Sequence, residues 1–435
     1  MNDGREPIGV IGTGYVGLVT AAGFAHLGSE VFCIDIDEDK VARLRAGEIP
    51  IYEPGLAEMV AENRERMHFS TDIGDALEHV RLLFVAVGTP PTYSGDADLS
   101  AVHAVVEAIP ASDRHALVMK STVPAGTGAA IKRVLAQNGK SGLRYVSCPE
   151  FLKEGSAVKD FLNPDRVVIG DDGDWAGDAV VDLYAPLEAP LVRTDLASAE
   201  MVKLASNAFL ATKISFINEI ANVCEETGAD VIEVARGMGL DDRIGQKFLQ
   251  AGIGFGGSCF PKDVNALKQL AGNSGYHFQL LNAVIEVNEL QKRRVIGKLQ
   301  KHLGSLVGKT ITLLGLAFKP ETDDMREASS LVLSARLQAD GANVRVFDPI
   351  AEGEARTLIR GVHFATDALD AVQDADAVVL VTEWRQFMAL DWEQVGERMA
   401  GRLVLDGRNA LDPDAIVAAG LIYEGIGRGT LTSLT

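Results

Sequence analysis

Residues 7–35 read PIGVIGTGYVGLVTAAGFAHLGSEVFCID, and this stretch decides the fold. A short apolar run leads into GTGYVG at 12–17, an apolar helical pattern follows, and a second apolar run ends at Asp35. In this context of strand, glycine loop, helix and strand, a G-x-G-x-x-G match predicts a dinucleotide-binding unit. The context disfavours the alternative, a glycine-rich turn without a ligand.

Each glycine of GTGYVG has a separate task. Gly12 permits the tight turn, Gly14 lets the backbone approach a pyrophosphate, and Gly17 lets the helix pack closely on the strand. The phosphates would lie at the helix N-terminus. Asp35 follows Gly17 by 18 residues, where its carboxylate can accept hydrogen bonds from both adenosine ribose hydroxyls. Because that carboxylate would repel a 2′-phosphate, we predict NAD rather than NADP.

Three further apolar runs end in small polar residues. The segments that follow them are Gly88-Thr89-Pro90, Ser121-Thr122-Val123-Pro124 and Cys148-Pro149-Glu150. In a parallel sheet the carboxyl ends of the strands are where ligands bind, so we place the site at that edge. Thr122 either orients a water through its hydroxyl or serves as a turn residue.

The overall composition is typical of a globular protein. The chain has 435 residues, which predicts two or three domains at roughly 150 residues each. Its net charge of −20 argues against a nucleic-acid binder and against a protein that binds anionic membranes. A phosphorylated ligand remains compatible, because loop amides and a few basic residues bind phosphate locally.

Cysteine usage indicates a reducing compartment. Neither the four cysteines nor the eight histidines have metal-ligand spacing, so we expect no disulfide framework and no metal site. The N-terminus has no signal-peptide pattern. No uninterrupted apolar run reaches the roughly 20 residues that span a bilayer. We therefore expect a soluble, cytoplasmic protein.

The C-terminal third repeats the pattern of the N-terminal third. The matching segments are 309–315 with 8–12, 344–349 with 31–36, and 365–384 with 71–90. Where the first copy has G-x-G-x-x-G, the second has GLAFK at 315–319. It keeps the fold and loses the dinucleotide loop, so we expect a Rossmann-like domain that binds something else.

Between these two copies the pattern changes to long helices. Residues 197–226 and 277–301 have apolar helical periodicity and no proline. Their apolar faces suit a dimer surface. The expected fold class is α/β, with two Rossmann-like doubly wound domains joined by a central helical segment. The expected domains are 1–196, 197–301 and 302–435.

Residues 252–263 read GIGFGGSCFPKD and contain a candidate nucleophile, Cys259. The glycines predict a backbone that bends tightly or comes very close to a ligand. Pro261 predicts a helix start, where the dipole and free N–H groups favour a thiolate. A lone cysteine is more often a small hydrophobe packed under a loop, but the surrounding glycines favour the reactive interpretation.

Four other polar residues suit chemistry. Lys203 and Asn207 are four apart on a predicted helix and could stabilise an oxyanion together, unless they form a solvated face. Glu150 and Glu154 lie in PEFLKEG at 149–155. A carboxylate there acts either as a general base or as a cap at a helix start.

Charged residues near the glycine-rich loops complete the candidates. Asp263 holds a water or a lysine, or stabilises the first turn of its helix. Arg243, Lys319 and Arg326 suit phosphate contacts, with surface salt bridges as the alternative.

Together these motifs resemble the UDP-glucose/GDP-mannose dehydrogenase family over nearly the whole chain. They occur in the order GTGYVG with Asp35, STVP, PEFLKEG, Lys203 with Asn207, GFGGSCFPKD and GLAFKPETDDMRE. The cysteine loop and the GLAFKP segment are highly specific to that family. One departure is Ser329-Ser330, where the family usually has a proline; we expect it to be tolerated.

The resemblance implies an NAD-dependent double oxidation of a nucleotide sugar, with UDP-glucose converted at C6 to UDP-glucuronate. Cys259 would form a thiohemiacetal and then a thioester, which water hydrolyses. Lys203 and Asn207 would stabilise the oxyanions, Asp263 would assist Lys203 or water, and Glu150 and Thr122 would handle water and protons. A simple alcohol dehydrogenase needs no thiol, whereas taking an aldehyde to an acid requires an adduct from which hydride can leave.

The resemblance also assigns the binding residues. Those expected at the cofactor are Gly12, Gly14, Tyr15, Val16, Gly17, Asp35, Lys40, Thr89, Pro90, Thr122, Glu154, Lys262 and Arg326. Those expected at the sugar nucleotide are Glu150, Phe151, Leu152, Lys153, Glu154, Lys203, Asn207, Arg243, Phe248, Leu249, Gln250, Ala251, Gly252, Gly256 and Lys319. Arg243 matches a family arginine that reaches into the neighbouring subunit's site, which implies a homodimer.

Three alternatives stay open. The same chemistry could act on GDP-mannose or a UDP-N-acetylhexosamine, although Phe255 and Ser258 look closer to the UDP-glucose members. A non-catalytic NAD-binding regulator would have lost the thiol or the lysine, and both are present. A hydroxyacid-type dehydrogenase with a single oxidation would not need Cys259.

Overall fold

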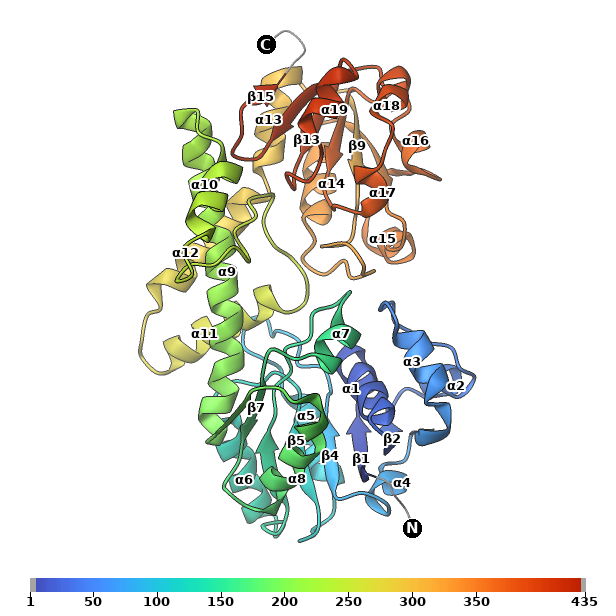
Figure 1. Ribbon diagram of the computed structural model, residues 1–435, viewed down its shortest axis with the longest axis vertical. Helices are drawn as coiled ribbons and strands as arrows, with labels where there is room; N and C mark the ends of the chain where they lie inside the picture. Colours follow the sequence, from blue (N-terminus) through green and yellow to red (C-terminus); the bar gives the residue numbers. More distant parts are fainter. Residues whose placement is uncertain (1–4, 432–435) are drawn as a thin grey trace. The chain divides into compact units, whose positions relative to one another are not determined.

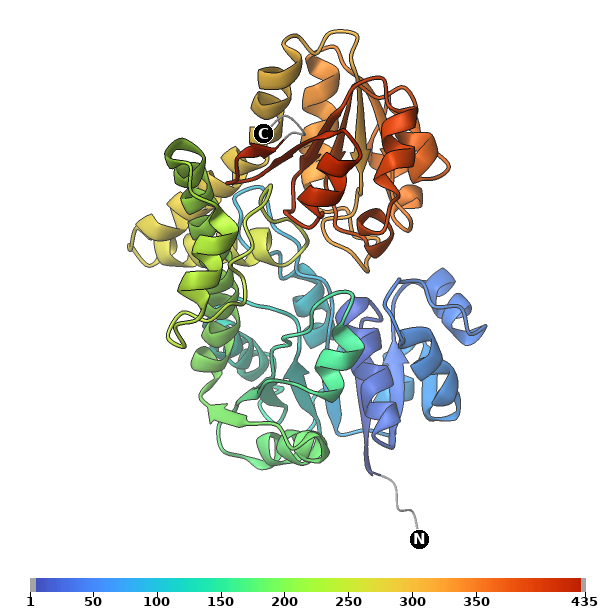
Figure 2. The same cartoon turned by 45° about the horizontal axis from the view of Figure 1, so that its top comes forward.

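The computed structural model describes residues 5–431. Figure 1 shows its ribbon, and Figure 2 shows it after a turn of 45°. The chain divides into two compact units, Met1–Ser206 with Asn265–Tyr276 and Asn207–Val264 with His277–Thr435. The division falls inside two helices, α9 (Leu196–Thr227) and α11 (Phe260–Asn273).

The first unit contains one sheet with the strand order β3-β2-β1-β4-β5-β6-β7-β8. Its strands are β1 Arg5–Ile11, β2 Ser29–Ile34, β3 Met67–Ser70, β4 Leu82–Val85, β5 Ala116–Met119, β6 Arg144–Ser147, β7 Val167–Gly170 and β8 Leu191–Thr194. Neighbouring strands run parallel, except that β6 and β7 are antiparallel. This order is that of a doubly wound dinucleotide-binding sheet, as predicted.

Helices cover both faces of this sheet. They are α1 Tyr15–His26, α2 Glu38–Arg45, α3 Leu56–Glu62, α4 Ile73–Leu77, α5 Ser100–Ala108, α6 Thr127–Gln137, α7 Ala157–Leu162 and α8 Trp175–Tyr184. In β4, Leu82 and Phe84 belong to the buried cluster that includes α1, whereas Leu83 and Val85 belong to the cluster that includes α5 and α6. Alternation along a strand places these pairs on opposite faces. A strand buried on both faces reads as a continuous apolar run, which is the pattern in the sequence.

The second unit repeats this topology, as predicted from the internal similarity. Its sheet has the order β11-β10-β9-β12-β13-β14-β15, and only β14 and β15 pair antiparallel among its described neighbours. The strands are β9 Thr310–Leu314, β10 Asn343–Phe347, β11 His363–Phe364, β12 Ala377–Leu380, β13 Leu403–Asp406, β14 Ile422–Gly425 and β15 Thr430–Leu431. Up to β14, the order of strands matches that of the first sheet from β3 to β6.

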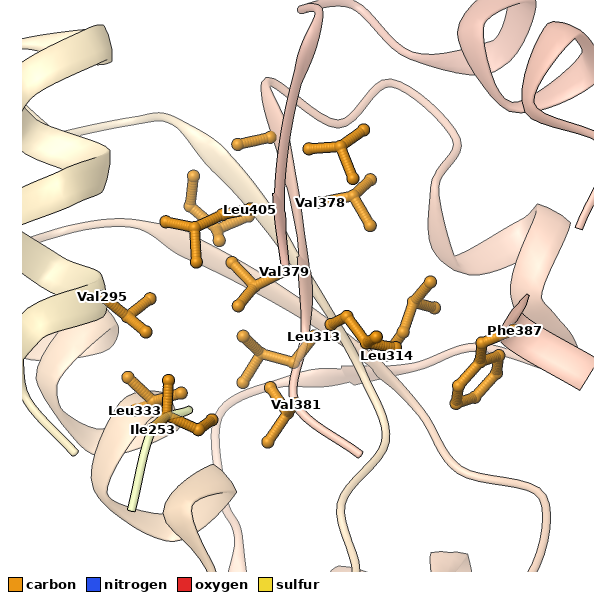
Figure 3. Close-up of a cluster of buried hydrophobic side chains, with 14 of the residues drawn as sticks. Ile253, Val295, Leu313, Leu314, Leu333, Val378, Val379, Val381, Phe387 and Leu405 are labelled. Carbon is orange, nitrogen blue, oxygen red and sulfur yellow. The ribbon is translucent and has the colours of Figure 1, made fainter. Parts of the chain in front are cut away.

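One large apolar cluster forms the core of the second unit. Figure 3 shows Leu313 and Val379 on the side of Val295, whereas Leu314 points toward Phe387. The helices of this unit beyond α9 and α11 are α10 Val231–Gly239, α12 Gln279–Gln291, α13 Arg294–Leu303, α14 Ser329–Ala339, α15 Glu352–Leu358, α16 Ala368–Ala371, α17 Arg385–Met388, α18 Trp392–Arg398 and α19 Pro413–Ala418. The alternating apolar residues of the strands therefore build a core on both faces of this sheet as well.

The second copy has a physical reason for lacking a dinucleotide loop. The buried Asp348, at the end of β10, accepts hydrogen bonds from the N–H groups of Leu316 and Ala317 at 2.6 and 3.1 Å. The helix after this loop, α14, starts only at Ser329. Asp35 makes the corresponding bond to Thr13 in the first copy, so the difference lies in Ala317, whose amide Asp348 also takes, and in the absence of a helix start directly after the loop.

The helix expected over 197–226 is confirmed by α9. The prediction of one continuous helix over 277–301 is wrong, because this segment forms two helices. The chain forms α12 and α13 instead, with Arg293 N–H turning back to Leu290 C=O at 3.1 Å. The two helices have different partners: α13 packs on α14 and β13, whereas α12 holds the loop before Cys259. The apolar periodicity continues through this turn, so the sequence pattern does not reveal it.

Candidate active site

The glycine loop between β1 and α1 leaves an open surface at the start of α1. Gly12 has a φ of +93°, and a Cβ there would lie 2.7 Å from the Ala86 carbonyl oxygen. A Cβ at Gly17 would lie 1.8 Å from the Gly12 carbonyl oxygen, whereas one at Gly14 would meet nothing within 4 Å. The surface at Gly14 is bare backbone at a helix N-terminus, which fits the pyrophosphate of a dinucleotide. Tyr15 and Val16 are the first two residues of α1.

Asp35 lies beside this loop, directly after β2. Its Oδ2 accepts hydrogen bonds from the N–H and the hydroxyl of Thr13 at 2.8 and 2.7 Å, and pairs with Lys40 Nζ at 3.0 Å. Burial raises the pKa of Asp35, but the hydrogen bonds from Thr13, Asp37 and Lys40 outweigh it and hold that pKa below its ordinary value of 3.8. The carboxylate is therefore ionised at neutral pH. Thr13 was missed, because the second position of G-x-G-x-x-G carries no side-chain requirement.

Three more strand ends meet at the same edge. β4 pairs parallel with β1 and with β5, and β5 pairs parallel with β6. The segments after these strands therefore lie together, as predicted. The Thr89 hydroxyl donates to the Thr122 carbonyl at 2.9 Å, and the carbonyl of the next residue, Pro90, accepts the Asp98 N–H at 2.8 Å.

Helix α9 contributes two buried charges to this edge. Lys203 Nζ lies 2.9 Å from Glu150 Oε1, and the two side chains are only 4% and 5% exposed. Glu200, one turn earlier, accepts the N–H groups of Gly126 and Gly128 at 2.7 Å each, which fixes the start of α6. Burial raises the pKa of Glu200 above its ordinary value. The sequence analysis did not predict a role for Glu200. Its spacing of three residues from Lys203 places both on one face of the helix, and this spacing could have indicated that role.

The loop 150–154, expected at the sugar nucleotide, has its own anchors. Leu152 N–H donates to Glu150 Oε2 at 2.6 Å. The guanidinium of Arg166 lies 3.5 Å from the ring centroid of Phe151. Lys153 Nζ pairs with Asp160 at 3.2 Å. The loop is therefore ordered by groups of the same unit.

Glu53, between α2 and α3, holds the end of this loop and was also missed. Its buried carboxylate accepts the N–H groups of Gly155 and Ala157 at 2.6 and 2.7 Å, and the Tyr15 hydroxyl donates to it. Burial, then the carboxylates of Glu53 and Glu154, raise the pKa of Tyr15 well above its ordinary value. Glu53 thus ties the glycine-loop helix to the loop that carries Glu154. A single acidic residue in a loop gives no periodic signal from which this could be predicted.

In the second unit, Cys259 immediately precedes α11. Its carbonyl accepts the Asp263 N–H at 2.8 Å, which starts the first turn, and its side chain is partly exposed. Asp263 itself is buried: Oδ2 accepts from Asn207 Nδ2 at 2.6 Å, and Oδ1 pairs with Lys262 Nζ at 2.7 Å. The structure therefore brings Asn207 and Asp263 together, one helical turn from the thiol. Asn207 also follows Lys203 by one turn along α9.

The other residues of this unit that were predicted to bind the cofactor or the sugar nucleotide lie in three segments of the chain. Arg243 pairs with Asp241 at 2.6 Å with an 88% exposed side chain, and Arg326 pairs with Asp324 at 2.7 Å. Lys319 Nζ lies 5.3 Å from the Phe318 ring centroid. In the segment from Phe248 to Gly252, Leu249, Ala251 and Gly252 are buried, whereas Gln250 is exposed. A Cβ at Gly256 would lie 2.3 Å from the Glu327 carbonyl oxygen.

Two features are absent from residues 5–431. No group of histidine, cysteine and carboxylate side chains there could hold a metal ion. None of the helices in that range combines the length and apolar character required to cross a bilayer.

A glycine loop that fits a dinucleotide, on the carboxyl edge of a doubly wound sheet, defines a class of protein, the NAD-dependent dehydrogenases. Three family models match the chain: the NAD binding domain of the UDP-glucose/GDP-mannose dehydrogenase family at 6–188, its central domain at 197–290 and its UDP binding domain at 312–413. The chain belongs to the UDP-glucose/GDP-mannose dehydrogenase family.

Named relatives cover nearly the full length. UDP-glucose 6-dehydrogenase TuaD of Bacillus subtilis (strain 168) is 48% identical over 97% of this chain and 93% of its own. A solved UDP-glucose dehydrogenase from Pyrobaculum islandicum is 39% identical with a TM-score of 0.91, covering 98% of this chain and 99% of its own. A UDP-D-ManNAc dehydrogenase from Pyrococcus horikoshii is 28% identical with a TM-score of 0.84, covering 97% and 99%. The family resemblance seen in the sequence is confirmed.

Proposed function

We propose that this enzyme oxidises C6 of UDP-glucose twice, with two NAD reduced, and releases UDP-glucuronate. The observation that carries the proposal is Cys259 at the start of α11, one turn from the Asn207–Asp263 pair. A thiol in this place is needed only if an aldehyde is taken on to an acid. The 48% identity to a UDP-glucose 6-dehydrogenase supports the choice of sugar.

The chemistry follows from the groups present. NAD, when bound at the glycine loop, accepts a hydride in each oxidation. After the first, the Cys259 thiolate adds to the aldehyde carbon and gives a thiohemiacetal. Loss of the second hydride from that carbon leaves a thioester. Water then attacks the thioester, the C–S bond breaks, and the carboxylate leaves with the thiolate restored.

The polar residues have separate proposed roles. Lys203 and Asn207 donate to the oxyanions that form at C6, where buried donors act most strongly. Glu150, paired with Lys203, takes protons from the alcohol and from the attacking water, and Thr122 orients that water. Asp263 orients Asn207 through their 2.6 Å hydrogen bond. Glu154 would lie near the nicotinamide when NAD is bound.

The residues proposed to bind the sugar nucleotide are given for each unit by itself. The UDP end would lie at the second Rossmann-like domain, whose family model is described as UDP binding. The proposed contacts there are Phe248, Leu249, Gln250, Ala251, Gly252, Gly256 and Lys319. The sugar end would meet loop 150–154, Lys203 and Asn207. Lys262 and Arg326 are proposed to contact the cofactor.

One experiment separates this proposal from its alternatives. Purified enzyme with excess NAD is given UDP-glucose, GDP-mannose, UDP-N-acetylglucosamine or UDP-N-acetylmannosamine, and NADH is counted per sugar nucleotide consumed. We expect two NADH with UDP-glucose and far slower turnover with the others. One NADH per UDP-glucose would refute the double oxidation. Faster turnover of another sugar nucleotide would reassign the substrate while keeping the chemistry.

A homodimer is also proposed, built on the exposed face of α9. Phe209, Phe216 and Val223 recur every seven residues on this helix and are 65%, 47% and 57% exposed. Large apolar side chains in one stripe favour burial against a second copy. Arg243 would then reach the partner's site. We expect Phe216→Glu to lower the mass measured by light scattering from two chains to one.

Of the four cysteines, Cys33, Cys148 and Cys224 are buried thiols, which suits a cytoplasmic location.

A further inference from the structure

Side-chain amides hold the backbone of the loop that leads to Cys259. The Gly252 N–H donates to Asn218 Oδ1 at 2.9 Å, and the Gly252 carbonyl accepts from Gln291 Nε2 at 2.9 Å. Both backbone groups of Phe255 pair with the same side chain: its N–H donates to Asn288 Oδ1 at 2.8 Å and its carbonyl accepts from Asn288 Nδ2 at 3.0 Å. These amides pair with the loop as a neighbouring strand would.

The amides that do this are buried. Asn218, Asn288 and Gln291 are 0%, 4% and 1% exposed. A buried amide group without partners costs about 1–3 kcal/mol, so the two hydrogen bonds of the buried Asn288 amide to the loop matter for stability. Asn288 uses both its donor and its acceptor on one residue of the loop. Its placement is therefore specific to Phe255.

The glycine between the two held residues fits the same arrangement. Gly254 has a φ of +85°, which disfavours any residue with a Cβ. A Cβ there would also lie 2.8 Å from Asn288 Oδ1. The glycine spacing of GIGFGGSC thus has a cause besides approach to a ligand: it admits the Asn288 side chain.

Two further contacts hold Ile253 and Gly254, the residues directly before Phe255. The Ser329 hydroxyl donates to the Ile253 carbonyl at 3.0 Å, and Arg408 Nη1 donates to the Gly254 carbonyl at 2.9 Å. The Ile253 side chain is fully buried and belongs to the same apolar cluster as Leu333 (Figure 3). Ser329 is one of the two serines at the place where the family usually has a proline. Its hydroxyl binds the Ile253 carbonyl, which the side chain of a proline could not do.

Only three residues separate Phe255 from Cys259. Gly257, within them, donates its N–H to the Arg326 carbonyl at 2.8 Å, and its Cα lies against the Phe318 ring, since a Cβ would come 2.7 Å from it. Because the residues between them are held in this way, a displacement of Phe255 would also displace the Cys259 thiol.

We propose that Asn288 is a positioning residue for the Cys259 thiol, which it sets at the start of α11 by clamping both backbone groups of Phe255. The catalytic consequence rests on the proposed function of Cys259. The geometric consequence does not, because an unclamped loop moves the thiol whether or not a substrate binds.

The test uses Asn288→Asp, with Asn282→Asp on the same helix as the matched control. Aspartate keeps the acceptor for Phe255 N–H and replaces the donor with an oxygen that faces the Phe255 carbonyl. The first readout is the alkylation rate of Cys259 by iodoacetamide in substrate-free full-length protein, followed by peptide mass analysis. We expect it to fall about fivefold in Asn288→Asp, because the helix start no longer favours the thiolate, and to stay unchanged in Asn282→Asp.

The second readout is kinetic. We expect kcat with UDP-glucose to fall about 10- to 100-fold in Asn288→Asp, as for a misplaced reactive group, with the KM for NAD unchanged. A general loss of folding would instead change both. Equal alkylation rates in all three proteins would overturn the proposal. Altered alkylation with normal turnover would keep the clamp and refute the proposed function of Cys259.

A third measurement needs no variant. In the wild-type enzyme, hydrogen exchange of the Phe255 amide should be as slow as that of the core strands β9 and β12, although it lies outside any strand. Exchange as fast as in an exposed turn would show that Asn288 does not hold this residue.

Discussion

Lys203 Nζ and Glu150 Oε1 lie 2.9 Å apart, and almost none of either side chain reaches solvent. The pair joins helix α9 to the segment after β6. Two charges removed from water depend strongly on each other, because neither has solvent to replace its partner. The same contact thus has a structural role, and it gives the proposed base a fixed place beside the proposed oxyanion donor.

Lys203→Met should cost stability as well as activity. It leaves a buried carboxylate unpaired, so we expect the free energy of unfolding to fall by about 3–5 kcal/mol. We expect kcat to fall at least about 100-fold, because a buried donor to the oxyanion is lost. Urea unfolding and steady-state kinetics measure the two effects.

The double variant Lys203→Met with Glu150→Gln is the control. With neither charge present, most of the lost stability should return, whereas activity should not. Equal instability of the single and double variants would show that the ion pair is not the cause.

Cys259→Ser should separate the two oxidations. A neutral serine hydroxyl is a far weaker nucleophile than a thiolate and forms little adduct with the aldehyde, so we expect overall formation of glucuronate to fall drastically while the first hydride transfer persists. NADH counted in a single turnover should then approach one per UDP-glucose instead of two. Glucuronate formed at a near-normal rate by this variant would rule out the covalent role.

Asp35→Ala should relax the preference for NAD over NADP. The ionised carboxylate would repel a 2′-phosphate, and Lys40, now 3.0 Å from it, loses its partner on substitution. We therefore expect the ratio of kcat/KM for NAD to that for NADP to fall at least about tenfold. The double variant with Lys40→Ala should recover part of the discrimination, since the freed ammonium is then absent. An unchanged ratio in Asp35→Ala would mean that another group discriminates.

Acid should weaken the second unit through Glu424. This buried carboxylate pairs with Lys298 at 3.0 Å and with His302, while Lys298 also pairs with Glu225 at 2.7 Å. Burial raises the pKa of Glu424, but its partners outweigh this and hold it below the ordinary value of 4.5. A carboxyl with a lowered folded-state pKa stabilises the fold above its ordinary pKa and loses that contribution as the pH falls through the folded value.

Glu424→Gln measures this contribution. We expect the variant to be less stable than the wild type by about 1–3 kcal/mol at neutral pH, since a buried charge partner is removed. The difference should shrink as the pH falls from 4.5 downward. Urea unfolding of both proteins at a series of pH values measures it, and a difference that does not depend on pH would contradict the assignment.

The parts of the molecule that could be predicted from the sequence are those with local patterns. Glycine spacing and apolar runs predicted both sheets, and the order of the second follows from its similarity to the first. The cysteine loop and its helix start were likewise visible, because Cys259, Pro261 and Asp263 are neighbours in the chain.

The groups that could not be predicted act on backbone far away in the sequence. Glu53 holds Gly155, 102 residues later, and Asn288 holds Phe255, 33 residues earlier. Their partners are N–H and carbonyl groups, which every residue has, so no pattern of residue types marks them. The turn between α12 and α13 could not be predicted either, because it depends on the surfaces against which the two helices pack.

Two glycines of the NAD loop should respond in opposite ways to alanine. At Gly17 a methyl would lie 1.8 Å from the Gly12 carbonyl oxygen, whereas at Gly14, whose φ of −74° suits any residue, it would meet no protein atom within 4 Å. We expect Gly17→Ala to lower the free energy of unfolding by about 1–3 kcal/mol, as overpacking does. Gly14→Ala should change it by less than about 0.5 kcal/mol, yet bind NAD at least about tenfold more weakly, because its methyl faces the pyrophosphate. Thermal unfolding and NAD titration by fluorescence measure the two effects. Normal NAD affinity in a folded Gly14→Ala protein would place the pyrophosphate elsewhere than on this loop.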